Sequence, residues 1–244
     1  MAGVRYSTVR HLVGALVAFA CVLGAGVASA EDEDPWEGFN RKIYRFNEGA
    51  DKYVIGPVAK GWNFLLPDQV ELAIDRFFEN IRFPIRFLND LLQAKPLAAA
   101  EDLGRFVINS SIGLAGFFDP ASKLGIKGHN EDFGQTLGYW GVPPGPYLVL
   151  PIVGPSSPRH ASGRIVDSAA AVYPYFTFLW VPVAVTATDM LNYRALIEET
   201  LTAEREAAMD FYVFQRNAYM QYRENLVRDR EEDESSDGDL YELD

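Results

Sequence analysis

Apolar side chains recur every three or four residues along much of this 244-residue chain, and this spacing constrains the fold more than any other feature. The first stripe follows Asp34-Pro35, which suits a helix start because Asp caps helices and Pro is tolerated at the first helical position. Its members are Trp36, Phe39, Ile43, Phe46, Ala50 and Tyr53. The spacing predicts an amphipathic helix to about Val54, with an aromatic face that suits a protein core or a bilayer interface.

Similar stripes predict three further helices in the first half of the chain, over 67–81, 85–92 and 97–109. Pro57 is expected to end or kink the first helix, and Pro84 to interrupt the second, because proline removes a backbone donor and clashes with the preceding turn. In the 97–109 segment the residues expected to face inward are Leu103, Phe106 and Val107.

In the second half of the chain, the apolar spacing predicts a short helix over 162–171. It also predicts a longer helix that begins at the cap Thr188-Asp189 and continues, bent or unbroken, to about Arg228. Between them, residues 175–187 are strongly apolar. This segment has 13 residues with a proline inside, and a bilayer span needs roughly 20. It therefore belongs in a core or at an interface, and the chain as a whole is expected to be a mainly α single domain.

The stretch from Gly134 to Arg159 breaks the helical pattern. It holds five glycines and six prolines among 26 residues and is otherwise mostly apolar, so its backbone conformations are specified and its side chains need shelter. Within it, Tyr147–Val153 is a fair candidate for a strand, in a small hairpin with Val142 or its neighbours. The stretch is either an ordinary packed loop or the shaped wall of a lipid-handling site.

The first thirty residues follow the plan of an export signal, with a basic start, an apolar run and small residues at the end. Cleavage after Ala30 is one interpretation. The other is a lipoprotein cleavage at Cys21, which would become the lipidated first residue, although Ala18 and Phe19 fit such a site poorly. Since Cys21 is the chain's one cysteine, the folded part has no disulfide to stabilise it.

The net charge of −12 is concentrated at the end of the chain. Residues 229–244 hold nine acidic side chains and one arginine, a composition typical of a solvated, disordered tail. The expected organisation is therefore an export signal (1–30), a helical domain (31–228) and an acidic tail (229–244). An acidic body without basic clusters argues against nucleic acid as a partner, because phosphates attract Lys and Arg.

Motifs for covalent chemistry are missing from the sequence: it has no phosphate-binding glycine loop, no nucleophile elbow and no zinc-protease helix. Ser156, Ser157 and His160 lie close in sequence, but neighbours in sequence do not make a catalytic triad, and the prolines around them indicate a rigid turn. His129 to Asp132 matches no metal-ligand spacing and is better explained as a polar helix start.

Several motifs, in order along the chain, resemble the VacJ/MlaA family of outer-membrane lipoproteins. The matching segments are DPWEGFNR (34–41), Tyr44-x-Phe46-Asn47, GLAGFFD (113–119), FGQTLG (133–138) with Gly141, Gly145-Pro146-Tyr147 and Leu150-Pro151. The resemblance covers roughly residues 34 to 225 and leaves out the signal and the acidic tail.

The resemblance implies a ring-like domain of amphipathic helices at the periplasmic face of the bacterial outer membrane, around a central amphipathic channel. Phospholipid misplaced in the outer leaflet would pass through this channel to a soluble periplasmic lipid carrier, and a trimeric porin would be a partner. No cofactor and no enzymatic step are expected. The channel residues implied are Gly134 and Gly138 at the lip of a loop, Gly141 and Gly145 as its hinges, and Phe46 and Asn47 as neighbours.

Two other functions remain open from the sequence. A membrane-surface scaffold would use its apolar faces for attachment and move no lipid. A soluble periplasmic lipid-binding module would carry about one lipid per molecule in a closed pocket.

Overall fold

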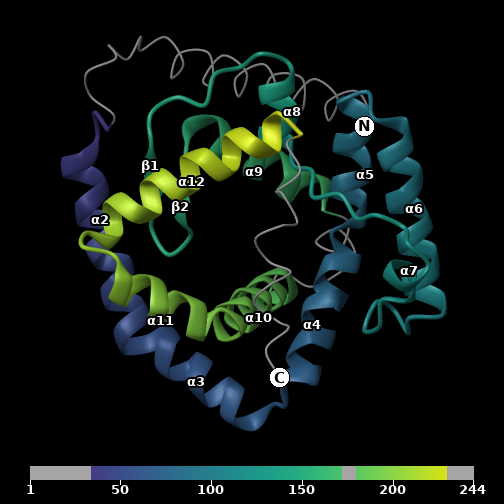
Figure 1. Ribbon diagram of the computed structural model, residues 1–244, viewed down its shortest axis with the longest axis horizontal. Coiled ribbons are helices and arrows are strands. Elements are labelled where there is room, and N and C mark those ends of the chain that lie inside the picture. The colour runs from purple at the N-terminus through teal and green to yellow at the C-terminus, as the bar shows by residue number, and fades with distance from the viewer. Residues whose placement is uncertain (1–33, 172–179, 230–244) are drawn as a thin grey trace, which may run out of the picture.

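The computed structural model describes residues 34–171 and 180–229, which form helices arranged around a central opening, with a small hairpin on one side (Figure 1). The export signal, the beginning of the apolar segment 175–187 and the acidic tail beyond residue 229 lie outside the described residues. The architecture is the mainly α ring expected from the sequence.

The elements follow one another in chain order as helices, with one short hairpin between α8 and α9. They are α2 (Glu37–Ala50), the π-helical turn η1 (Asp51–Ile55), α3 (Gly56–Leu65), α4 (Asp68–Ile81), α5 (Phe83–Leu92), α6 (Pro96–Ser111), α7 (Pro120–Lys123), α8 (Phe133–Tyr139), β1 (Leu148–Leu150), β2 (Gly154–Ser156), α9 (Pro158–Ala170), α10 (Trp180–Leu196), α11 (Glu198–Ala207) and α12 (Phe211–Val227).

The ring closes because the C-terminal helices return to the N-terminal ones. In Figure 1, α2 and α3 form the left and lower sides and α4 and α5 the right side, while α12 crosses the top. Helix α10 packs against both α3 and α4, α8 packs against α9, and α12 contacts α8 and β2. The ring is therefore closed by contacts between helices that are distant in sequence.

The first helix does not end at Pro57. The chain stays helical from α2 through η1 into α3, and Gly56 donates its amide to the carbonyl of Asp51, five residues earlier. A proline ring clashes with the preceding turn of a regular α-helix, and the wider π turn just before Pro57 relieves this crowding. Of the two effects expected at Pro57, an end of the helix is therefore wrong, because the helix changes its hydrogen bonding at η1 and continues.

The helix boundaries after residue 180 also differ from the expectation. Thr188 and Asp189 lie inside α10, and the Asp189 carboxylate accepts from Arg82 at 2.5 Å instead of capping a helix. The helical region then breaks twice before Arg228. At the second break Asp210 caps α12 by accepting from the backbone N–H groups of Tyr212 and Val213.

The strand expected within 147–153 is present, but its partner differs. β1 pairs antiparallel with β2, so that Leu148 lies opposite Ser156 and Leu150 opposite Gly154. Val142 instead accepts a hydrogen bond from the Arg159 side chain through its carbonyl. The hairpin therefore closes on the residues after the strand and not on those before it.

The buried part of the protein is unusually polar. Among the described residues, eleven apolar and eighteen polar or charged side chains are buried, whereas the core of a soluble domain is mainly apolar. The buried amides include Asn40, Asn80, Asn89, Asn109 and Asn192. The apolar core is small, consisting of Tyr147, Val149 and Tyr212 with partly buried neighbours on α2 and α12.

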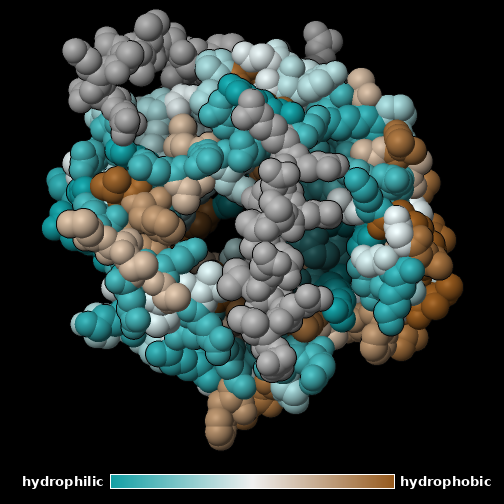
Figure 2. Space-filling view, viewed as in Figure 1, coloured by the Kyte–Doolittle hydropathy of each residue, from teal (hydrophilic) through white to brown (hydrophobic). Residues whose placement is uncertain are grey.

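The outside of the ring is correspondingly apolar. Leu103 and Val107, expected to face inward, are exposed, while Asp102 and Asn109 on the same helix are buried. Figure 2 shows apolar residues gathered on the outer right edge, over α6 and α7, and a hollow near the middle of the same face. No helix within the described ranges is both long and apolar enough to cross a membrane. Exposed apolar side chains that gather on one side of a molecule commonly mark a surface that binds protein or lipid.

Candidate functional site

Two asparagines on α2 hold the hairpin against the ring. The Asn40 amide donates to the carbonyl of Tyr147 at 2.9 Å and accepts from the N–H of Val149 at 2.9 Å. Asn47, seven residues and about two turns later, repeats the pattern by donating to the carbonyl of Leu150 and accepting from the N–H of Ile152. Each side chain thus replaces the hydrogen bonds that a neighbouring strand would make to β1.

Asn40 was not among the predicted site residues, although it is fully buried and carries these bonds. The sequence feature that could have identified it is its spacing of seven residues from Asn47, which places both asparagines on one side of the helix. Phe46, a predicted neighbour of the channel, is 55 % exposed on the adjacent face. The structure therefore puts Asn47 in the support of the hairpin and leaves Phe46 accessible.

The predicted glycines fall into two groups. Gly134 and Gly138 lie inside α8 and not in a loop, which corrects that expectation. Gly141 and Gly145 follow the helix with φ angles of +88° and +74°, in the left-handed region that favours glycine. These two residues shape the turn that leads from α8 to the hairpin.

Gly134 and Gly138 permit close packing of three helices. A Cβ atom at Gly163 of α9 would lie 2.4 Å from the backbone nitrogen of Gly134, so the two helices touch through their backbones. A Cβ atom at Gly138 would lie 2.9 Å from Arg159 Nη1 and from the methyl groups of Val227 on α12. Side chains at these positions would push α8 away from α9 and α12.

A buried ion pair joins α8 to α12 next to these glycines. Asp132 caps α8, as the polar helix start predicts, and binds the Arg223 guanidinium through both carboxylate oxygens at 2.6 and 2.9 Å. Burial alone would raise the pKa of Asp132, but Arg223 outweighs it and the pKa is lowered to about 2. Burial and the charge of Arg223 lower the pKa of His160 to about 3, so its ring is neutral at pH 7.

The serines near His160 serve as structural groups. Ser157 caps α9 by accepting from the backbone N–H of His160 at 3.2 Å, and the Nδ1 atom of the ring lies 2.7 Å from the hydroxyl of Tyr219. The expected rigid turn is thus a helix start, in which Pro158 occupies the first helical position.

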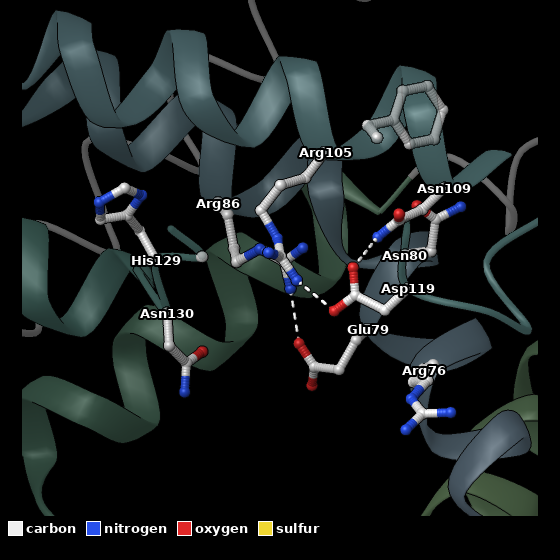
Figure 3. A pocket seen from close by; sticks show the side chains of 11 residues that line it. Arg76, Glu79, Asn80, Arg86, Arg105, Asn109, Asp119, His129 and Asn130 are labelled. Atoms are coloured by element: carbon white, nitrogen blue, oxygen red, sulfur yellow. Dashed lines mark hydrogen bonds and ion pairs between the residues drawn. The ribbon is translucent and has the colours of Figure 1, made fainter. Parts of the chain in front are cut away.

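A cavity of about 300 Å³ lies between α4, α5, α6 and the segment before α8. Figure 3 shows Arg86 and Arg105 reaching toward Glu79 and Asp119, with nitrogen–oxygen distances of 2.6 and 2.7 Å. Asn109 also donates to Asp119. Both of these largely buried guanidinium groups therefore have a carboxylate partner, and a third arginine, Arg76, also lines the cavity.

The described part of the chain thus combines polar buried contacts, exposed apolar side chains and a hollow near the middle of one face. The clamped hairpin follows a turn to which two left-handed glycines give an unusual backbone shape.

The comparisons with known proteins agree with this geometry. A family model described as MlaA lipoprotein matches residues 32–226. The chain is 36 % identical over 205 residues to the intermembrane phospholipid transport system lipoprotein MlaA of Haemophilus influenzae, covering 82 % of this chain and 81 % of the relative. It is 33 % identical over 194 residues to the Escherichia coli K12 protein of the same name, covering 77 % and 76 %.

A solved structure described as the structural basis for maintenance of bacterial outer membrane lipid asymmetry matches with a TM-score of 0.71 and 29 % identity. The match covers 80 % of this chain and 98 % of that one. The fold, the matched length and the relatives agree, and the chain belongs to the MlaA lipoprotein family.

Proposed function

We propose that this chain is the outer-membrane component of an intermembrane phospholipid transport system. It takes phospholipid misplaced in the outer leaflet through the opening of its ring and passes it to a soluble periplasmic carrier, which keeps the membrane's lipids asymmetric. The names of the Haemophilus influenzae and Escherichia coli relatives support this role. The proposed position is the periplasmic face of the outer membrane, with a trimeric porin as partner.

The inverted distribution of side chains is the observation that carries the proposal. A phospholipid head group that crosses the bilayer core loses its hydration at a large cost in free energy, whereas the acyl chains are apolar and pay no such cost. Leucines and phenylalanines exposed on the ring offer an apolar surface to lipid, and the hollow near its middle (Figure 2) offers a path for the head group. The buried amides bond to backbone groups of neighbouring elements and hold the shape of the ring. This task requires no covalent step.

The test is to delete the gene in the bacterium that encodes this chain. Phospholipid accessible to phospholipase on intact cells should rise, and the cells should become sensitive to detergent, with both effects reversed by the wild-type gene. Altered envelope shape with normal surface phospholipid would instead indicate a scaffold. Mature chain in the periplasmic fraction with about one bound lipid would indicate a soluble binding module.

The proposed hinge role of Gly141 can be tested with a substitution that causes no steric clash. A Cβ atom there meets no atom within 4 Å, so Gly141→Ala changes only the backbone, at a cost of about 1 kcal/mol for the left-handed conformation. We expect surface phospholipid to rise in cells carrying this variant. Gly125→Ala is the matched control, since Gly125 has a φ of +74° and equally open space after α7. Equal phenotypes, or none for Gly141→Ala, would refute the hinge.

The mode of attachment is a separate proposal, because Cys21 and Ala30 lie outside the described residues. Mass spectrometry of the mature N-terminus distinguishes a lipidated Cys21 from a chain that begins at Glu31.

A further inference from the structure

A second cavity, of about 480 Å³, lies between α12 and the start of α9. Its lining residues are Pro144, Ser157, Arg159, Tyr219, Met220, Gln221, Arg223, Glu224, Val227 and Arg228. Three arginines and one glutamate line it, so its lining carries an excess of positive charge. One wall belongs to the turn that Gly141 and Gly145 shape, because Pro144 in that turn lines the cavity.

Arg159 is the unusual residue in this cavity. Its side chain is 8 % exposed, and within the described ranges no carboxylate lies at ion-pair distance from it. Nη1 donates to the carbonyl of Val142 at 2.8 Å, while Nε is buried without a partner. Burial and the nearby charge of Arg223 both lower the pKa of Arg159, which reflects an unfavourable environment for an isolated cation.

The charges of the neighbouring arginines are compensated, although Nε of Arg223 is also buried without a partner. Arg223 is neutralised by Asp132 on the side of α8, and Arg228 pairs with Glu224 one turn earlier on α12. Arg159 alone therefore brings an uncompensated charge to the cavity. A buried guanidinium without a counter-charge costs free energy, and an anion bound beside it would offset that cost.

The chemistry of the cavity indicates which anion fits. Guanidinium groups bind phosphate oxygens through charge-assisted hydrogen bonds, and Ser157, Tyr219 and Gln221 add neutral polar groups. Met220 and Val227 offer an apolar side, which free phosphate would not use. We propose that the Arg159 cavity binds the phosphate group of a phospholipid, as a resting place beside the glycine turn. This inference rests on the proposed transport function.

The experiment titrates the full mature chain, in a non-ionic detergent, with three probes: inorganic phosphate, glycerophosphoglycerol and dihexanoylphosphatidylglycerol. Binding is measured by calorimetry. Arg159→Gln removes the charge and should weaken binding about tenfold or more, as expected for loss of a charge-assisted hydrogen bond. Tighter binding of the short-chain lipid than of phosphate identifies a lipid head group. Equal binding identifies free phosphate as the ligand and overturns the lipid assignment.

A second variant keeps the test decisive if Arg159→Gln does not fold. Gln221→Glu places a carboxylate on the exposed part of the lining, where it should weaken binding of all three probes while leaving the fold intact. Gln215→Glu is the matched control on the same helix, because Gln215 does not line the cavity. No binding of any probe, or binding that Gln221→Glu leaves unchanged, would overturn the site.

The two proposals fail separately. Absence of anion binding removes this site and leaves the deletion phenotype to decide transport. Normal surface phospholipid after deletion removes the transport function, whereas Arg159-dependent binding would still stand as an anion site.

Discussion

Replacing Asn40 with alanine is expected to lower the free energy of unfolding by about 2–5 kcal/mol, because it leaves two buried backbone groups without partners. These groups are the carbonyl of Tyr147 and the N–H of Val149, and both residues are about 99 % buried. The variant also loses the bond from the Asn40 amide to Asp34. In detergent-solubilised protein the melting temperature, followed by circular dichroism, should fall by about 10 °C.

Asn47→Ala is the matched control, since Asn47 makes the same pair of bonds to the hairpin. The group that donates to Asn47 is the N–H of Ile152. Because Ile152 is exposed, water can accept from this N–H when the asparagine side chain is removed. The expected loss is about 1 kcal/mol. Equal losses for the two variants would mean that burial of the Asn40 clamp does not determine its strength.

Replacing Gly163 with alanine is expected to destabilise the protein by about 3 kcal/mol, at the upper end of the usual cost of overpacking. The added Cβ would lie 2.4 Å from the nitrogen and 2.7 Å from the Cα of Gly134. Both are backbone atoms at the start of α8, which Asp132 caps and where the Asp167 carboxylate accepts from the N–H of Phe133 at 3.0 Å. Since no flexible side chain can yield, α8 and α9 must separate.

Gly104→Ala provides the control for this substitution. Gly104 lies within α6, and a Cβ atom there meets nothing within 4 Å. Alanine is favoured over glycine inside helices, so this variant should be more stable by about 0.5–1 kcal/mol. Melting temperatures in the same detergent compare the two. If Gly163→Ala melted at or above the wild type, the close approach of α8 and α9 would be wrong.

Local features of the sequence predicted local features of the structure well. The α4 and α6 helices lie close to the expected ranges, and Asp132 caps α8. Caps, prolines and periodicity act over a few residues, so one segment contains the information. Predictions were wrong where a distant residue intervened: Asp189 looks like a cap, but Arg82, between α4 and α5, binds it from outside the helix.

The site was predicted only in part. The motif residues Gly141 and Gly145 have the special backbone expected of them, whereas Gly134 and Gly138 are packing residues of a helix. The sequence could not predict that Arg159 lacks an ion-pair partner, because the tertiary structure decides which carboxylates lie near an arginine. The carboxylates that might have served it, Asp132 and Glu224, are bound by Arg223 and Arg228.

The sequence by itself determined that the chain is helical, where several of its helices begin, and which family it resembles. It also showed that each helix has an apolar and a polar face. Only the tertiary structure decided which face points inward: Asn40 is buried while Phe39 on the same helix is exposed. The physical reason is that periodicity defines two faces but not the medium that each one meets. The contacts between helices made this choice: the Asn40 side chain bonds to Asp34, Tyr147 and Val149, whereas no such partners among the described residues cover Phe39, which is 53 % exposed.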